Sequence, residues 1–587
     1  MGVGLERFRF SNWHQHARWL LLSIAVGVVA GLGAVFFDRL LDNALEFFVK
    51  LPISFFEPNV GNPLAVDISE TGFSLWIIPI ATIGGLLSGL LVFNIAPETE
   101  GHGTDAMIES FHLQGGFTRK RTPFIKILAS ALTIGSGGSG GKEGPIAQIG
   151  SGFGSLLATW LDLKPRERRV LLLAGAAGGI GAIFQAPLGA ALFVPGVLYR
   201  ETEYEYEAIL PCIISAIMAH AVFSEMYGRH ALFQPGNVAF DLPVEFIPYT
   251  IFGILCALVG FIYIKFFYGM RDYFFNKLPI PRMFRPAVGG FMLGCVAYYY
   301  PQIIDGGYVW IQLALDGKMI WETMLLLVFI KIAATSFTIS SGGSGGVFGP
   351  SVFIGAMLGG AFGGIGHMIA PDWVVNPNSF ILVGMGGFFA GVAKVPIASI
   401  IMACEMSSSY TLLVPLMLVS TISYLILGKM SLYEKQFSSR LDSPAHINEF
   451  ARGVLSVLHV RDALISEHVS SLEEGLPIGS VVKIVTQYPE SYYPVVSVDG
   501  DLKGILSIND IRELMFEEAQ SNVLVAKDVA STNVITVLED DTLQTALEKM
   551  IALNVNALPV VAKDNPKKLV SMLSKQDLIT CYYNRGD

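Results

Sequence analysis

Residues 124–145 read FIKILASALTIGSGGSGGKEGP. This stretch returns 205 residues further on, at residues 329–350, as FIKIAATSFTISSGGSGGVFGP, with 15 of the 22 aligned positions identical. Each copy is an apolar helix that runs into a Gly/Ser-rich break, followed by a Gly-Pro that can start a new helix. Apolar segments interrupted by glycine or proline at matching places in two halves of a chain are typical of a membrane transport site.

The repeat extends beyond this stretch. Residues 175–187, GAAGGIGAIFQAP, are echoed by residues 384–396, GMGGFFAGVAKVP. Two similar halves of this kind predict two structural repeats around one pathway. The residues themselves leave open whether the repeats are inverted.

The composition is that of a membrane protein. Of the 587 residues, 52% are hydrophobic and only 15% are charged, whereas soluble domains average about 25% charged residues. Apolar runs recur from Trp19 to Leu427. Several have about 20 residues, enough to cross a bilayer, and others have only about 10–14, which fits half-helices or broken spans. We therefore expect an all-α polytopic membrane domain over residues 1–433, with broken and tilted helices.

The basic N-terminal segment orients this domain. Arg7, Arg9 and Arg18 precede the first apolar run, and no small-residue cleavage site follows. The run is therefore interpreted as a membrane anchor rather than a cleaved signal. By the positive-inside rule we expect the N-terminus in the cytoplasm of a multi-pass cell (inner) membrane protein.

Charge and cysteine usage exclude several classes of function. The formal net charge of −10 argues against a nucleic-acid partner. The five cysteines form no CxxC pair and are interpreted as small buried hydrophobic residues: Cys212, Cys256, Cys295, Cys404 and Cys581. No metal site, required cofactor or enzymatic activity is predicted.

After Tyr433 the composition changes. Residues 434–457 are expected to form a polar linker. Residues 458–587 alternate short β-rich runs with amphipathic helices, as a soluble α/β domain does. This tail is itself a repeat, with halves at about 458–518 and 525–587.

Each half of the tail ends a strand-like run in Ser-x-x-Asp: Ser507 with Asp510, and Ser574 with Asp577. The halves resemble a cytoplasmic tandem pair of CBS domains, which often bind adenine nucleotides. The Asp can accept hydrogen bonds from ribose hydroxyls, and the Ser hydroxyl with the helix amides behind it can hold phosphate. Many such pairs bind no nucleotide and act as dimer contacts, so binding of ATP, ADP or AMP and a dimerising role both stay open.

The Gly-rich breaks in the membrane half suggest how an anion is held. A glycine run before a helix leaves the first amides of that helix exposed, and those N–H groups at the positive helix end attract anions. Two such breaks can aim two helix ends at one point. The two copies differ just before the Gly-Pro, where the first has Lys142-Glu143 and the second has Val347-Phe348. A carboxylate at such a helix end competes with an anion, which makes Glu143 a natural gate.

The breaks admit three other interpretations. A phosphate-binding P-loop does not fit, because residue 136 is Ser and Glu143 follows Lys142. Flexible loops outside the membrane do not explain why both breaks stand beside long apolar runs. Glu143 as an ordinary helix-start carboxylate, favoured by the helix dipole, is compatible with a gate.

At these residues the chain resembles the CLC family of chloride channels and proton/chloride exchangers. Four ordered elements carry the resemblance: Gly101-His102-Gly103-Thr104-Asp105 in the place of the family's GSGIP, Gly141-Lys142-Glu143-Gly144-Pro145 for GKEGP, Gly346-Val347-Phe348-Gly349-Pro350 for GxFxP, and Tyr433 for the tyrosine near the end of the last membrane helix. The resemblance covers the whole chain, because many members carry a C-terminal CBS pair.

The resemblance implies a fold and a mechanism. It implies homodimers in the lipid membrane, each subunit holding one pathway for chloride or another small anion between two inverted repeats. Glu143 would be the gating glutamate, blocking when ionised and swinging away when protonated or displaced. The amides of Val347 and Phe348 and the Tyr433 hydroxyl would line the central anion site.

Two positions depart from the family in the first element. The family serine that faces the central anion is His102 here, and the family proline is Asp105. A neutral imidazole can donate a hydrogen bond to an anion, and a charged one binds it more strongly. His102 is therefore expected to influence which anion is preferred. A histidine that only caps a helix or packs is the alternative.

A further departure concerns protons. The inner glutamate of the family's exchangers falls on Val197, and an aliphatic side chain cannot relay a proton. We therefore expect passive conduction by a gated channel. Coupled exchange, with Glu201 about one turn further on as a substitute relay, and a nucleotide-responsive sensor are the alternatives. The acidic run from Glu201 to Glu207 is otherwise interpreted as a solvated helix end.

Three charged residues lie in or beside apolar runs. Lys126 and Lys331 either raise the local potential for anions or snorkel to a surface. Glu405 is interpreted as a structural buried acid.

Overall fold

The computed structural model describes residues 4–51, 74–229, 231–236, 238–240, 242–446, 455–464, 470–487, 492–508, 510, 524–553 and 555–584. It divides into two compact units, Met1–Ala445 and His446–Asp587. Residues 434–445, the first part of the expected linker, belong to the first unit. They do so because their backbone bonds to it: the amide of Phe437, for example, donates to the carbonyl of Leu198 at 3.2 Å.

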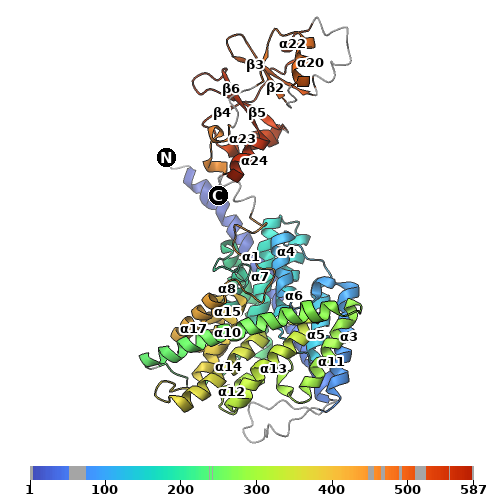
Figure 1. Cartoon of the computed structure of the whole chain (residues 1–587), viewed down its shortest axis with the longest axis vertical. Helices are drawn as coiled ribbons and strands as arrows, with labels where there is room; N and C mark the ends of the chain where they lie inside the picture. The colour runs from blue at the N-terminus through green and yellow to red at the C-terminus, as the bar shows by residue number, and fades with distance from the viewer. Residues whose placement is uncertain are drawn as a thin grey trace. The chain divides into compact units, whose positions relative to one another are not determined.

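The first unit is a bundle of α-helices (Figure 1). In chain order these are α1 (Gly4–Leu45), α3 (Ile77–Ile95), α4 (Thr104–Leu113), α5 (Thr122–Gly135), α6 (Glu143–Trp160), α7 (Pro165–Ile183), α8 (Pro187–Gly196), α9 (Tyr206–Tyr227), α10 (Phe246–Gly269), α11 (Arg285–Ala297), α12 (Tyr308–Leu315), α13 (Trp321–Ser340), α14 (Phe348–Ile369), α15 (Ser379–Ala393), α16 (Pro396–Ser407) and α17 (Leu413–Leu427). Short π or 3₁₀ turns extend or join them: η1 (Glu46–Lys50), η2 (Pro97–Thr99), η3 (Pro243–Glu245), η4 (Met270–Phe274), η5 (Phe275–Lys277), η6 (Arg282–Phe284) and η7 (Pro301–Ile303).

Long and short apolar helices are mixed in this unit. Within the described ranges, six stretches are long and apolar enough to cross a membrane: Ala17–Lys50, Ile77–Ile95, Tyr206–Tyr227, Pro243–Lys277, Trp321–Ser340 and Phe348–Ile369. Five further apolar helices, α5, α8, α15, α16 and α17, have 10–17 residues. This mixture agrees with the expected multi-pass membrane domain with broken spans.

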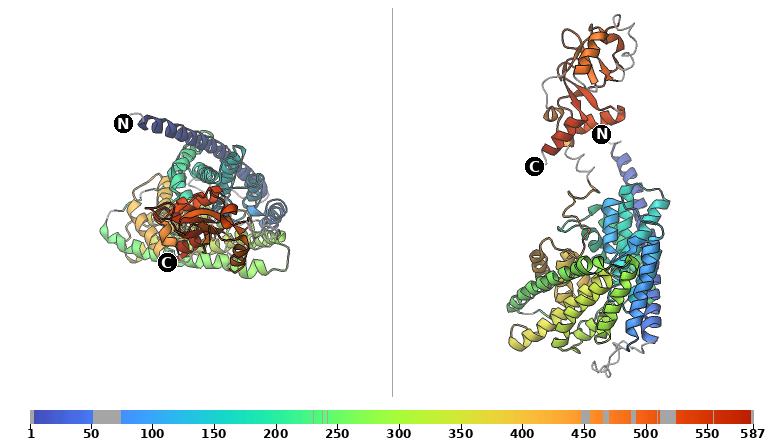
Figure 2. Two further views of the ribbon diagram at one scale, coloured as in Figure 1. Left: turned by 90° about the horizontal axis from the view of Figure 1, so that it is seen from above. Right: turned by 45° about the vertical axis from the view of Figure 1, so that its right-hand side comes forward.

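The two halves of the unit are inverted repeats. The series α4, α5, α6 corresponds to α12, α13, α14, and the glycines before α4 and α12, Gly103 and Gly307, both have φ of 80°. In Figure 1, α4 lies near the upper end of the helical bundle and α12 near its lower end. The right-hand view of Figure 2 shows the first-half helices, blue to teal, beside the second-half helices, green to yellow.

Glycine lets the repeats pack closely. A Cβ added to Gly150 of α6 would lie 2.2 Å from the carbonyl oxygen of Gly175 in α7. The same distance separates a Cβ on Gly355 of α14 from the carbonyl oxygen of Gly384 in α15. Small residues at such crossings let helices associate where lipid removes the hydrophobic driving force. One apolar core spans both halves.

The second unit contains two small sheets of the same topology. Its strands are β1 (Leu472–Glu473), β2 (Tyr492–Val496), β3 (Leu502–Ser507), β4 (Val537–Leu538), β5 (Ala557–Val561) and β6 (Leu569–Ser574), and its helices α19 (Val460–Ala463), α20 (Ile478–Gln487), α22 (Ala526–Val529), α23 (Leu543–Leu553) and α24 (Lys575–Asn584). In each sheet the middle strand pairs parallel to the first and antiparallel to the third, with Tyr493 opposite Leu506 and Leu558 opposite Leu573.

The two halves of the second unit exchange their first elements. Val460 and Ala463 of α19 are buried in the core around β4–β6, and Ala526 of α22 is buried in the core around β1–β3. Each helix therefore completes the core of the other half. The expected halves, 458–518 and 525–587, are continuous in sequence. Each hydrophobic core, however, contains residues from both halves.

Candidate anion site

The two glycine-rich breaks meet at one place. The amide of Gly141 donates to the carbonyl oxygen of Gly346 at 2.8 Å, and the amide of Gly346 donates back to Gly141 at 2.6 Å. This antiparallel bridge stands directly before the first turns of α6 and α14. Because both helices begin beside it, two positive helix ends share one location.

A third glycine-rich segment, residues 101–103 before α4, packs on the same place. The amide of Gly345 donates to the carbonyl oxygen of Gly101 at 3.3 Å. A Cβ on Gly144 would lie 1.9 Å from the carbonyl oxygen of His102, and one on Gly103 would lie 2.5 Å from that of Gly144. The close approach of three backbone segments therefore requires glycine at these positions.

Each break is held by hydroxyl groups of the opposite repeat. The amide of Ser139 donates to Oγ1 of Thr338 at 3.1 Å, and the amide of Ser344 donates to Oγ1 of Thr133 at 3.2 Å. All four residues are buried. Since their polar groups are satisfied inside the unit, the breaks are internal framework and not external loops.

Glu143, the first residue of α6, lies in front of both breaks. It is 2% exposed, and its Oε2 accepts a hydrogen bond from the amide of Gly349 in α14 at 3.3 Å. Its Oε1 has no hydrogen-bond partner among the described residues. The amides of Val347 and Phe348 likewise make no hydrogen bond within the described part of the chain. The carboxylate therefore occupies a position beside amides that remain available to an anion.

Lys142 does not face this position. Its Nζ lies 2.6 Å from Oδ1 of Asp38 in α1, and the Asp38 side chain is 8% exposed. Its charge is therefore balanced by Asp38, and the two helix ends add positive potential at the site.

Two buried lysines support the backbone around the site. Lys126 and Lys331 are both fully buried, so neither snorkels to a surface. Nζ of Lys126 donates to the carbonyl oxygen of Gly101 at 2.8 Å, and Nζ of Lys331 donates to that of Asp305 at 2.6 Å. These carbonyl groups lie just before α4 and α12, so the lysines fix equivalent turns in the two repeats.

His102 and Tyr433 lie together on the α4 side. Their ring centroids are 5.4 Å apart, and His102 is 8% exposed and Tyr433 1% exposed. The Tyr433 side chain lies beside Thr104 at the start of α4. Nδ1 of His102 is buried without a hydrogen-bond partner in the parts of the chain that the structure describes.

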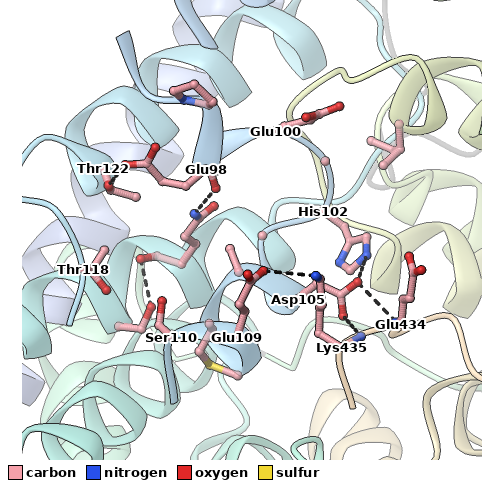
Figure 3. Close-up of a pocket in the computed structure, with 18 of the residues that line it drawn as sticks. Glu98, Glu100, His102, Asp105, Glu109, Ser110, Thr118, Thr122, Glu434 and Lys435 are labelled. Atoms are coloured by element: carbon pink, nitrogen blue, oxygen red, sulfur yellow. Dashed lines mark hydrogen bonds and ion pairs between the residues drawn. The ribbon is translucent and has the colours of Figure 1, made fainter. Parts of the chain in front are cut away.

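Asp105 links His102 to the segment after Tyr433 (Figure 3). Its Oδ2 lies 3.2 Å from Nε2 of His102, and its two oxygens accept hydrogen bonds from the amides of Glu434 and Lys435 at 3.3 and 3.2 Å. This carboxylate, where the family has proline, anchors the imidazole and the chain that leaves the membrane unit.

A cavity of about 690 Å³ opens beside this cluster. Its lining includes His102, Gly101 and Gly103 but not Glu143 (Figure 3). Basic residues in the lining pair with acidic ones, Arg119 with Glu98, Arg271 with Glu434, and Lys435 with Glu109. The cavity thus reaches His102 from the side of α4.

Val197 directly follows α8 as its C-cap residue and is fully buried. Its carbonyl oxygen accepts a hydrogen bond from Nε2 of Gln436 at 2.9 Å. Glu201 is exposed, as expected for a solvated end, but that interpretation is wrong for Glu205. Glu205 is 5% exposed because it accepts a hydrogen bond from the Tyr199 hydroxyl.

Glu405 caps a helix. Its carboxylate oxygens accept hydrogen bonds from the amides of Leu188 and Gly189 at 3.2 and 2.7 Å, at the start of α8. The structural role expected from the sequence is confirmed, although the side chain is only partly buried.

In each Ser-x-x-Asp motif of the second unit, the serine and the aspartate are hydrogen-bonded to each other. Oδ2 of Asp510 accepts hydrogen bonds from both the amide and the hydroxyl of Ser507 at 2.8 Å. Asp577 accepts the same pair from Ser574 at 2.8 and 2.7 Å. The pattern is that of a helix cap, and it accounts for these residue types without a ligand.

One residue at the site was missed by sequence reasoning. Tyr308, the first residue of α12, faces Gly349 and Glu143. The 205-residue offset pairs Thr104 with Val309, one residue further on, so the matching helix starts identify Tyr308 and the sequence offset does not.

Fold and site together define a membrane protein in which two inverted repeats bring helix N-termini to one buried, anion-attracting centre. The family profile described as voltage gated chloride channel matches residues 84–428, and the CBS domain profile matches residues 460–517 and 526–584. The chain belongs to the CLC family and carries a CBS pair.

Known relatives include proteins named as H(+)/Cl(-) exchange transporters and a protein named as a chloride channel. The chain is 28% identical over 426 residues to the H(+)/Cl(-) exchange transporter ClcA of Vibrio campbellii, covering 71% of this chain and 88% of that protein. It is 27% identical over 477 residues to the chloride channel protein CLC-e of Arabidopsis thaliana, and the match covers 77% of this chain and 65% of that protein.

Solved structures share the fold. A slow cyanobacterial Cl-/H+ antiporter superposes with a TM-score of 0.61 at 21% identity, covering 70% of this chain and 94% of that one. A eukaryotic CLC transporter superposes with a TM-score of 0.59 at 19% identity, and the match covers 96% of this chain and 98% of that one. The expected CLC fold is confirmed.

Proposed function

We propose that the protein conducts chloride or another small anion passively, through a pathway that Glu143 closes in this structure. The observation that carries the proposal is the buried carboxylate of Glu143, held by the amide of Gly349 across the junction of the two repeats. An ionised carboxylate in this place excludes a second anion. A protonated one loses its attraction to the helix ends and can leave.

The proposed route begins at the cavity on the α4 side. An anion there meets His102 and the Tyr433 hydroxyl, and then the amides of Val347 and Phe348 at the start of α14. The phenol and the two amides are neutral donors, so they can bind an anion without trapping it. The anion then has to pass the position of Glu143 before it can leave on the side where α12 lies.

Passive conduction is favoured over coupling by the residues around Val197. The position holds an aliphatic side chain, and the buried acid nearby, Glu205, is already engaged by Tyr199 and Arg440. Coupled proton/anion exchange is the second candidate. It is favoured by relatives that are named H(+)/Cl(-) exchange transporters at similar identity.

Liposomes that contain the purified full-length protein separate the two candidates. A chloride gradient is imposed, and anion and proton movements are recorded together. A reversal potential that follows the anion gradient alone supports the channel. Uphill proton movement driven by chloride contradicts it, and Glu201→Gln and Glu205→Gln then identify the relay.

We further propose a homodimer in the cell membrane, with the N-terminus and residues 458–587 in the cytoplasm and residues 434–457 joining them to the membrane domain. The outer faces of α9 and α17 support contact with lipid or a second copy, since Leu210 is 70% exposed and Leu425 66%. Cross-linking in native membranes tests the dimer. We propose regulation by adenine nucleotide at the CBS pair as well, tested by flux with and without ATP.

A further inference from the structure

Tyr308 occupies the place in the second repeat that Thr104 holds in the first. Each is the first residue of a short helix, α12 or α4, and each follows a glycine with φ of 80°. The turns before the two helices are held alike, since Lys331 bonds to the carbonyl oxygen of Asp305 and Lys126 to that of Gly101. Because the repeats are inverted, Tyr308 approaches the site from the side opposite Thr104.

The Tyr308 hydroxyl and the Glu143 carboxylate face the same small space. A Cβ added to Gly349 would lie 2.7 Å from the hydroxyl oxygen of Tyr308 and 3.1 and 3.3 Å from Oε1 and Oε2 of Glu143. Gly349 has no side chain, so the phenol and the carboxylate can both approach the first turn of α14 this closely. An anion that replaces the carboxylate there meets the phenol and the Gly349 amide together.

Both facing oxygens are unsatisfied. Within the described part of the chain, the Tyr308 hydroxyl and Oε1 of Glu143 are buried and have no hydrogen-bond partner. Buried polar atoms are almost always paired, and an unpaired one costs free energy. A donor and an acceptor that share one space therefore call for either a direct bond or a ligand between them.

The Tyr308 ring is positioned by aromatic packing. Its centroid lies 6.0 Å from that of Phe233, and a Cβ on Gly306 would lie only 2.6 Å from the Tyr308 ring. The ring therefore has a fixed setting, and rotation of the hydroxyl hydrogen decides which acceptor it serves.

We propose that Tyr308 is a second tyrosine of the anion pathway, on the α12 side of Glu143, matching Tyr433 on the α4 side. A small movement of either the Tyr308 or the Glu143 side chain lets the Tyr308 hydroxyl donate to Oε1 of Glu143 when the pathway is closed, and the hydroxyl donates to the passing anion when the carboxylate has left. This deepens the proposed function and rests on Glu143 as the gate.

The lysines around Glu143 are engaged with other groups, so Tyr308 is the side chain placed to donate a hydrogen bond to Oε1. The charged and titratable groups that act on the Glu143 carboxylate include Lys142, Asp305, Lys331 and Tyr433. Lys142 is paired with Asp38, and Lys331 points its ammonium at backbone carbonyl groups. Hydrogen bonds to a charged acceptor are the strong ones, so the phenol favours the ionised, blocking form of Glu143.

The test is Tyr308→Phe, which removes the hydroxyl and keeps the ring. Proton-activated anion flux is measured in liposomes as a function of pH. Without the donor, Glu143 takes up a proton more readily, so the midpoint of activation should move up by about one pH unit. The relative permeabilities of chloride, bromide and nitrate should change as well, because the donor to the anion is lost.

Tyr249→Phe is the matched control. Tyr249 is a buried tyrosine of α10 that stacks on Phe380, and its change should leave midpoint and permeabilities as in the wild type. In a Glu143→Gln background, Tyr308→Phe should no longer affect the pH dependence. A purely structural role of Tyr308 would not produce this loss of effect.

The outcomes separate the two proposals. If Glu143→Gln itself leaves flux and its pH dependence unchanged, the gate assignment fails and this inference with it. If Glu143→Gln opens the pathway while Tyr308→Phe keeps the wild-type midpoint and permeabilities, only the role of Tyr308 is overturned. Should Tyr308→Phe not fold, 3-fluorotyrosine at residue 308 strengthens the donor and should move the midpoint to lower pH; no movement overturns the inference.

Discussion

Gly141 and Gly346 donate their amide hydrogens to each other's carbonyl oxygens, at 2.8 and 2.6 Å, although 205 residues separate them in the chain. The two hydrogen bonds join the starts of α6 and α14 and so fix the distance between two helix N-termini. A side chain at Gly141 would displace the Glu143 carboxylate, because its Cβ would lie 1.8 Å from Oε2. The bridge therefore explains why the site needs glycine on both sides.

Gly144→Ala is expected to disrupt this junction. The new Cβ would lie 1.9 Å from the carbonyl oxygen of His102, and neither backbone can move without breaking its neighbours' bonds. Overpacking of this kind costs about 1–3 kcal/mol or more. Thermal unfolding of the purified protein should shift to lower temperature, and flux should fall.

Gly269→Ala is the control for that substitution. Gly269 ends α10 and has open space around its Cβ position, so alanine should be neutral or slightly stabilising. Equal stability of the two variants would mean that the contact between Gly144 and His102 does not constrain the fold.

Glu143→Gln should raise anion flux several-fold and flatten its dependence on pH. Glutamine keeps the shape of the side chain but is always neutral, so it competes poorly for the helix ends. Initial rates of chloride efflux from liposomes between acidic and alkaline pH measure both effects. Glu207→Gln, which breaks an exposed ion pair with Arg166, should change neither. A folded Glu143→Gln protein with wild-type rates at every pH would remove Glu143 from the pathway.

His102→Ser should change the order or spacing of the anion permeabilities. It replaces an imidazole that Asp105 holds against Tyr433 with a smaller hydroxyl donor. Hydrogen bonds of this kind differ by about 1 kcal/mol, so chloride, bromide and nitrate permeability ratios should move by a few-fold. Bi-ionic reversal potentials provide the measurement. Ratios that match the wild type would place His102 outside the anion route.

Much of the fold could be predicted from the two copies of one stretch. Identical breaks beside apolar helices require two equivalent structural units, and motifs at matching positions specify the family and hence the inversion. Residues next to one another in the motifs, such as Gly141 and Glu143, stay neighbours because a helix start is local structure.

Partners from distant segments could not be predicted. The ion pair of Lys142 with Asp38, the inward direction of Lys126 and the burial of Glu205 all depend on tertiary packing of helices whose sequences are uniformly apolar. The exchange of α19 and α22 between the two sheets is invisible for the same reason: each helix fits either core by composition. Tyr308 was hidden because its equivalent, Thr104, differs in residue type and the 205-residue offset between the repeats pairs Thr104 with Val309 instead.

The last prediction concerns the CBS pair. Asp577→Ala should lower the thermal stability of the second unit by about 1 kcal/mol, the usual worth of a helix cap, because Asp577 accepts hydrogen bonds from both the amide and the hydroxyl of Ser574. Asp564→Ala, at an exposed position, should have little effect. Differential scanning calorimetry of the full-length protein, with and without millimolar ATP, measures the cap and the proposed nucleotide site together. ATP should raise the unfolding temperature of the wild type and of Asp564→Ala by a similar amount, and that of Asp577→Ala by less. A rise of the same size in all three proteins would mean that the corner at Asp577 only caps α24, and no rise in any of them would leave the pair without a nucleotide.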